Sequence, residues 1–132
     1  MQNEQVRKKV KIVADSTCDL SKELTDKYDI ELPTTSAPNQ LYYEEKYREW
    51  SSQGYEVVHF SISLSFTVTH NIAKMAAEKF SGIYPVDSRN ISAGMGLLAI
   101  MAAQMRDSGL SAAQIAERSR AECDRIQTSF IL

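Results

Sequence analysis

The chain alternates between short apolar runs and longer segments in which apolar residues recur at helical spacing. Runs rich in β-branched and aromatic residues predict strands at 10–14, 55–62 and 83–86, and a shorter extended piece is predicted at 30–32. The segments between these runs repeat their apolar residues every three or four positions, which predicts helices. Strands that alternate with helices in this way predict a three-layer α/β fold, with a mainly parallel sheet and helices on both faces.

The last third of the chain contains two predicted helices and one more predicted strand. The helix at 94–105 is apolar on nearly every side, so we expect it to be buried in the core. Ser111 and Gln114 have the spacing of a capping box, which predicts the start of a last helix. The apolar residues 129–132 predict the beginning of another strand. Because natural domains end in polar linkers, a chain that stops inside an apolar strand is expected to be a truncated domain.

The length of the chain predicts one domain, and its composition excludes several classes of partner. Of the 132 residues, 1–9 are expected to form a polar tail and 10–132 a single domain. With 15 Lys and Arg against 17 Asp and Glu, the chain lacks the basic excess of nucleic-acid-binding proteins, so no nucleic-acid partner is expected. No apolar run reaches the ~20 residues of a transmembrane helix. Cys18 and Cys123 fit neither a disulfide framework nor a zinc site, so a cytoplasmic protein without metal or cofactor is expected.

Hydroxyl-bearing residues gather where the predicted strands end. Ligands of open parallel sheets lie at the carboxyl ends of the strands, which directs attention to the loops 15–19, 33–38, 63–69 and 87–92. In two of these loops hydroxyls stand just before a predicted helix, where unpaired N–H groups and the helix dipole favour a carboxylate or a phosphate. The same hydroxyls also fit ordinary helix N-caps. The candidate ligand-binding residues are Asp15, Ser16, Thr17, Thr35, Ser36, Thr67 and Thr69.

The patterns that would indicate catalysis are incomplete in this sequence. Asp15 follows a strand, as the nucleophile of aspartyl phosphatases does, but Thr17 stands where those enzymes have a second aspartate. The chain has no Walker-type phosphate loop and no complete dinucleotide fingerprint. His59 and His70 lack the spacing of a Ser-His-Asp triad or a metal site, so both are interpreted as structural. We therefore predict no catalytic residue and keep an aspartate-dependent hydrolase only as a remote alternative.

Three motifs in a fixed order resemble those of one protein family. They are KIVADSTCDLS at 11–21, PTTSAP at 33–38, and VDSR at 86–89 followed by SAGMG at 92–96. Together they resemble the DegV family of bacterial fatty-acid-binding proteins. The resemblance covers residues 10–132 but only the N-terminal lobe of a family member, which implies a shortened chain without the second lobe.

The resemblance implies a carrier rather than an enzyme. Members of the family bind a long-chain fatty acid, and many present it to a separate fatty-acid kinase that makes the acyl phosphate. Hydroxyls at the positions of Thr35 and Thr67 hold the carboxylate in the family. The connection before Pro33 is shorter than in the family, and Val68 replaces a glycine that would let the backbone approach a ligand. The alternative is a degenerate or truncated scaffold that binds no lipid and self-associates into homo-oligomers.

Overall fold

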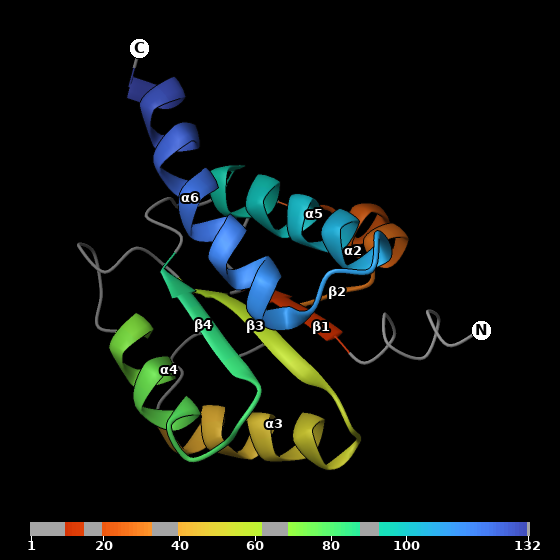
Figure 1. The fold of residues 1–132 in the computed structure, drawn as a ribbon, viewed down its shortest axis with the longest axis vertical. Helices are drawn as coiled ribbons and strands as arrows, with labels where there is room; N and C mark the ends of the chain where they lie inside the picture. Colours follow the sequence, from red (N-terminus) through yellow and green to blue (C-terminus); the bar gives the residue numbers. More distant parts are fainter. Residues whose placement is uncertain (1–9, 15–19, 33–39, 62–68, 88–92, 132) are drawn as a thin grey trace.

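The computed structural model describes residues 10–14, 20–32, 40–61, 69–87 and 93–131. Strands and helices alternate along these residues until the last two elements, which are both helices. The architecture is a parallel sheet with a helical layer on each face (Figure 1). The predicted three-layer α/β fold is therefore confirmed.

The sheet has four strands in the described part of the chain, and all of their pairings are parallel. They are β1 (Val10–Ala14), β2 (Ile30–Glu31), β3 (Glu56–Ser61) and β4 (Ile83–Asp87). The order across the sheet is β2-β1-β3-β4. In this register Ile12 lies opposite Ile30 and Val58, and Val58 lies opposite Tyr84. Each strand predicted within these residues forms, with ends that differ from the predicted ones by one residue at most.

The helices form the two outer layers (Figure 1). They are α2 (Lys22–Tyr28), α3 (Gln40–Ser52), α4 (Thr69–Ala77), α5 (Ala93–Asp107) and α6 (Ala112–Ile131). The pair α3 and α4 packs on one face of the sheet, and α2, α5 and α6 pack on the other. Parallel strands need crossover connections of this kind, so the helical layers follow from the direction of the strands.

The alternation of side chains along the strands produces two apolar cores. Ile12 and Val58 belong to the core between the sheet and the layer of α2, α5 and α6. Val13 and Val57, their neighbours in sequence, belong to the core on the other face, where Tyr47 of α3 is also fully buried. Residues adjacent in the sequence therefore stabilise opposite layers.

Helix α5 is buried along most of its surface, as predicted. Leu98 and three alanines of this helix, Ala99, Ala102 and Ala103, are at most 1% exposed. Leu97 is an exception, because it is 44% exposed on the face that points away from the sheet. The expectation of a helix buried on nearly every side is therefore confirmed for the inner face and wrong at Leu97.

The described chain ends in a helix, so the predicted strand at 129–132 is wrong. Helix α6 extends through Ile131, and Leu132 lies outside the described residues. The capping box that starts α6 is confirmed, since Ser111 Oγ accepts the Gln114 N–H at 3.3 Å and Gln114 Oε1 accepts the Ser111 N–H at 3.0 Å. A short apolar run fits a helix as well as a strand, and a helix already started adds a hydrogen bond with each residue. The expectation of a truncated domain stays a prediction.

Candidate functional site

Three strands of the sheet end side by side at one edge, which we call the carboxyl edge. Ala14, Ser61 and Asp87 are the last residues of β1, β3 and β4. Ser61 lies opposite Asp87, and Ala14 lies opposite Phe60, the residue before Ser61. Each of these three strands is followed directly by one of the hydroxyl-rich loops identified in the sequence. This is the edge at which parallel sheets bind their ligands.

The predicted ligand-binding residues belong to the connections that follow β1, β2 and β3, and β2 also ends at this edge, since Glu31 lies opposite Val13. Thr69 is the first residue of α4, and the structure describes its backbone. The other six, Asp15, Ser16, Thr17, Thr35, Ser36 and Thr67, lie outside the described residues. The same is true of Cys18, Val68 and the tail 1–9. The contacts of these side chains therefore stay predictions, and the structure adds the arrangement of the strands and helices that flank them.

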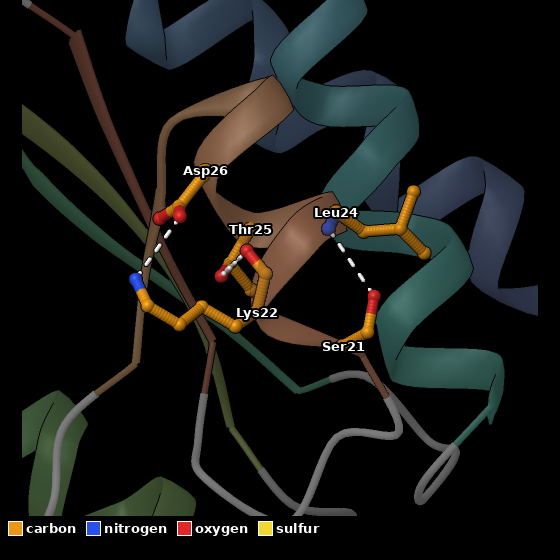
Figure 2. A network of polar contacts seen from close by, with 5 residues as sticks. All are labelled: Ser21, Lys22, Leu24, Thr25 and Asp26. Carbon is orange, nitrogen blue, oxygen red and sulfur yellow. Dashed lines mark hydrogen bonds and ion pairs between the residues drawn. The ribbon is translucent and has the colours of Figure 1, made fainter.

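The start of α2 shows how one helix at this edge is capped. Ser21 Oγ accepts a hydrogen bond from the backbone N–H of Leu24 at 3.2 Å (Figure 2). Thr25 Oγ1 donates to the carbonyl oxygen of Lys22 at 2.9 Å, and Lys22 Nζ lies 3.0 Å from Asp26 Oδ2. Because Ser21 Oγ accepts an N–H of the first turn, Ser21 is an ordinary N-cap of α2.

The last residue pair of β3 and β4 is polar. Ser61 is fully buried, and its Oγ donates to the carbonyl oxygen of Val86 at 3.4 Å. Asp87 is half-buried, and its carbonyl oxygen lies 3.6 Å from Cys123 Sγ of α6. Helix α6 therefore reaches the carboxyl edge from the face opposite α3 and α4.

Two residues before the end of β3, His59 forms a buried hydrogen bond. Its Nδ1 lies 2.7 Å from Tyr47 Oη of α3, and both side chains are fully buried. The ring of Tyr43 lies against both, with its centroid 5.1 Å from that of His59 and 6.0 Å from that of Tyr47. The interpretation of His59 as structural agrees with this environment. The hydrogen bond between His59 and Tyr47 was not predicted from the sequence. Its one signal there is that His59 alternates with Val57 and so lies on the face of β3 that packs against α3.

A second polar contact joins α3 to the turn after α4. Glu44 Oε2 lies 3.1 Å from Lys79 Nζ and accepts a hydrogen bond from Gln40 Nε2 at 2.9 Å. The hydrogen bond from Lys79, followed by that from Gln40, lowers the pKa of Glu44 below its usual value. Glu44 is therefore an anion at neutral pH, and Lys79 balances its charge.

A shallow depression of about 400 Å³ lies between the end of α5 and α6. Its lining residues are Met101, Gln104, Met105, Ser108, Leu110 and Arg118. Helix α5 begins after the carboxyl end of β4 and ends beside the turn that leads into the start of β2, so the depression lies away from the carboxyl edge. It shares no residue with the predicted site.

The described ranges contain neither a metal site nor a membrane-spanning helix. No three His, Cys, Asp or Glu side chains among these residues come together in a group that could hold a metal ion. In the same part of the chain, no helix combines the length and the apolar character that crossing a membrane requires.

Comparison with protein families and curated sequences gives one consistent result. Residues 30–132 match the model of the DegV family, whose members are described as uncharacterised proteins. A DegV domain-containing protein from Clostridium perfringens is 31% identical over 138 aligned positions, which cover 78% of this chain and 50% of the relative. That alignment is longer than the part of this chain it covers, so the relative has residues that this chain lacks. A DegV domain-containing protein from Clostridium acetobutylicum is 25% identical over 81% of this chain and 51% of the relative. The chain spans about half the length of these relatives.

Solved structures from the same family share the fold. A DegV lipid-binding protein from Thermotoga maritima has a TM-score of 0.78 at 20% identity, over 89% of this chain and 55% of that chain. A stearic-acid-binding protein from Eubacterium ventriosum has a TM-score of 0.71 at 26% identity, over 87% of this chain and 52% of that chain. DegV from Bacillus subtilis, a fatty-acid-binding protein, has a TM-score of 0.72 at 20% identity, over 89% of this chain and 53% of that chain. Of these three neighbours, the proteins from Eubacterium ventriosum and Bacillus subtilis are described as binding fatty acids and the one from Thermotoga maritima as binding lipid.

Proposed function

Because this chain belongs to the DegV family, we propose that it binds a long-chain fatty acid and holds the carboxylate at the carboxyl edge of the sheet. The hydroxyls of Thr35 and Thr67 donate hydrogen bonds to the carboxylate oxygens, and bonds to a charged acceptor are stronger than those between neutral groups. The other predicted residues of this site are Asp15, Ser16, Thr17, Ser36 and Thr69. The protein carries the acid and does not transform it.

The observation that carries the proposal is the shared edge of the strands. β1, β2 and β3 precede the predicted ligand-binding residues and end beside one another, so the segments that follow them begin side by side. Helices α3 and α4 begin directly after the segments that contain Thr35 and Thr67, and the two helices pack against each other. Their N-terminal N–H groups and dipoles favour negative charge nearby. Two hydroxyls that precede adjacent helices at one edge support a carboxylate site.

We also propose that a separate fatty-acid kinase is the protein partner. An acyl phosphate forms when a carboxylate oxygen of the acid attacks the terminal phosphorus of ATP and ADP leaves. The sequence of this chain has no phosphate loop, so we assign the nucleotide to the kinase. A carboxylate held at the edge of the sheet is close to the surface, where a second protein reaches it.

Native mass spectrometry tests the binding of a fatty acid. The chain is produced in bacteria, measured as isolated, then stripped of lipid and titrated with palmitate. We expect little fatty acid to be retained through isolation, because the binding is expected to be weak, and a complex with palmitate to form in the titration. Hexadecanol is the matched control, because it has the same chain without the carboxylate, and it is expected to bind more weakly.

The same measurements distinguish the alternatives. Equal binding of palmitate and hexadecanol contradicts a carboxylate site. Binding of neither, together with homo-oligomers in sedimentation, supports the scaffold that binds no lipid.

A further inference from the structure

The outer face of α5 is apolar, although it lies away from the sheet. Leu97, Met101 and Met105 follow one another at four-residue spacing, which places them in one row along the helix. Ala99 and Ala102, on the side toward the sheet, are fully buried. Leu97 is 44% exposed, and the two methionines are only partly buried. Because a surface helix carries polar residues on its outer side, this row is an apolar face that the other described residues leave partly open.

The row leads into the depression between α5 and α6. Met101 and Met105 line it from α5, Leu110 from the turn between the helices, and Arg118 from α6. The depression is shallow, so it would leave most of a small molecule in water, whereas a ligand pocket encloses its ligand. Flexible methionine side chains adapt their shape to a protein partner. The depression therefore fits side chains that project from another protein.

Arg118 gives this surface its charge. It is the one charged residue among those that line the depression, and it is exposed. Its guanidinium forms no hydrogen bond or ion pair with the other described residues. Asp107, at the end of α5, already lies 3.1 Å from Nε of Arg106. A guanidinium beside apolar side chains favours a carboxylate, which it binds through two parallel hydrogen bonds.

We propose that this surface docks an acidic amphipathic helix of a partner protein. It consists of Leu97, Met101, Met105, Leu110 and Arg118, and we call it the α5–α6 surface. Apolar side chains on one face of the partner helix pack along the row and into the depression, and an Asp or Glu beside them pairs with Arg118. The α5–α6 surface shares no residue with the predicted fatty-acid site, so the inference does not rest on the proposed function.

Charge and shape favour this partner over a second copy of the chain and over a membrane. A second copy that docks through the same surface brings no carboxylate to Arg118, because no acidic residue lines the depression. A bilayer surface does not project into a depression, and binding to anionic lipids takes a cluster of basic residues rather than one. An amphipathic helix supplies both the projecting apolar side chains and the carboxylate.

Fluorescence anisotropy with designed peptides tests the docking. The probe is a fluorescein-labelled helix of about 18 residues, with leucines four positions apart and glutamates beside them, and a second peptide has lysines in place of the glutamates. We expect the glutamate peptide to bind at least about tenfold more tightly. In an NMR spectrum of the methionine methyl groups, Met101 and Met105 should shift on binding. Met75 of α4, in the opposite layer, is the internal control and should not shift.

Charge reversal gives the sharpest variant. Arg118→Glu is expected to weaken binding of the glutamate peptide by about tenfold and to strengthen that of the lysine peptide by a similar factor, because attraction and repulsion exchange. Lys74→Glu, at an exposed position of α4, is the matched control and should change neither affinity by more than about twofold. Leu97→Gln should weaken the glutamate peptide about fivefold, whereas Leu41→Gln, at a position of α3 that is 62% exposed, should not.

The possible results separate this partner from the others. Exchange of the peptide preference in Arg118→Glu, with methyl shifts at Met101 and Met105, supports the proposal. Equal binding of the two peptides, or binding of neither, overturns it. Binding to phosphatidylglycerol vesicles in place of the peptides assigns the surface to a membrane and overturns it. Self-association that Leu97→Gln abolishes assigns the surface to a second copy and overturns it as well.

Discussion

Arg106 of α5 caps the end of α2 by donating from Nη2 to the carbonyl oxygen of Tyr28 at 2.7 Å. Its Nη1 donates to the carbonyl oxygen of Asp29 at 3.2 Å, and its Nε lies 3.1 Å from Asp107 Oδ1. Asp29 has the left-handed conformation, with φ at 55°, that ends α2 and leads into β2. A guanidinium that is only 6% exposed thus satisfies carbonyl oxygens that a helix end leaves without partners.

Replacement of Arg106 by glutamine is expected to lower the free energy of unfolding by about 2–3 kcal/mol, because it leaves two carbonyl oxygens without their charged donor. Urea unfolding measures the change. Arg118→Gln is the matched control, since this arginine is exposed and forms no hydrogen bond or ion pair with the other described residues; it should stay within about 0.5 kcal/mol of the parent. Equal stability of the two variants contradicts the capping role.

The ion pair of Glu44 and Lys79 predicts a pH-dependent contribution to stability. Lys79 lowers the pKa of Glu44 in the folded state, so the contribution is present above the unfolded pKa of about 4.3 and is lost as pH falls through the lower folded value. Glu44→Gln is therefore expected to be less stable than the parent at neutral pH, and the difference should close in acid. Thermal unfolding across pH 3–7, with Glu45→Gln on the same helix as the control, measures this. A constant difference at all pH values argues against the ion pair as its cause.

Two glycines with positive φ predict different costs for the same substitution. Gly82 has φ of 82°, and an added Cβ would lie 3.1 Å from Glu56 Cγ, whereas Gly109 has φ of 102° with nothing within 4 Å. Gly109→Ala is expected to cost about 1–2 kcal/mol from backbone strain, and Gly82→Ala somewhat more. In the Glu56→Ala background, Gly82→Ala and Gly109→Ala are expected to cost about the same free energy, because the Cγ atom of Glu56 is then absent. Chemical denaturation of the single and double variants checks this, and an unchanged difference in the Glu56→Ala background speaks against the contact.

The predicted hydroxyl ligands can be tested one at a time. Thr35→Val and Thr67→Val each remove a hydroxyl at nearly constant shape, and each is expected to cost about 1.5–3 kcal/mol of fatty-acid binding. Isothermal titration with palmitate measures the affinities, and hexadecanol should be insensitive to both changes. If both variants bind palmitate as the parent does, the carboxylate lies elsewhere.

The 132-residue chain is expected to bind palmitate weakly, because it spans about half the length of its relatives. Full burial of ~15 methylenes contributes about 12 kcal/mol, and a groove that covers half of them contributes about 6. That corresponds to a Kd of tens of micromolar at best, before the cost of ordering the tail. Submicromolar binding by a clean monomer would show that the tail is enclosed by this chain alone.

Most elements, their order and the edge at which a ligand is expected could be predicted from local patterns in the sequence, with the exception of residues 129–131. Apolar runs at 10–14 and 83–86 predicted strands because the period of side chains along a strand is a local property. The capping box of Ser111 and Gln114 needs only residues three positions apart. The candidate loops followed from the parallel order of the strands, and the family from short motifs within those loops. The contacts of the predicted site residues, from Asp15 to Thr69, still depend on experiment.

Contacts between residues of separate elements, in contrast, could not be predicted and are known only from the packing of the layers. In the sequence His59 was interpreted only as a structural histidine, and neither Tyr47 nor Arg106, which lies 78 positions from Tyr28, was singled out. Residues 129–131 became helix although their apolar pattern fits a strand equally well. Periodicity fixes the face on which a side chain lies. Which group lies opposite it within hydrogen-bonding distance depends on how whole layers pack, and that information is spread over residues far apart in the chain.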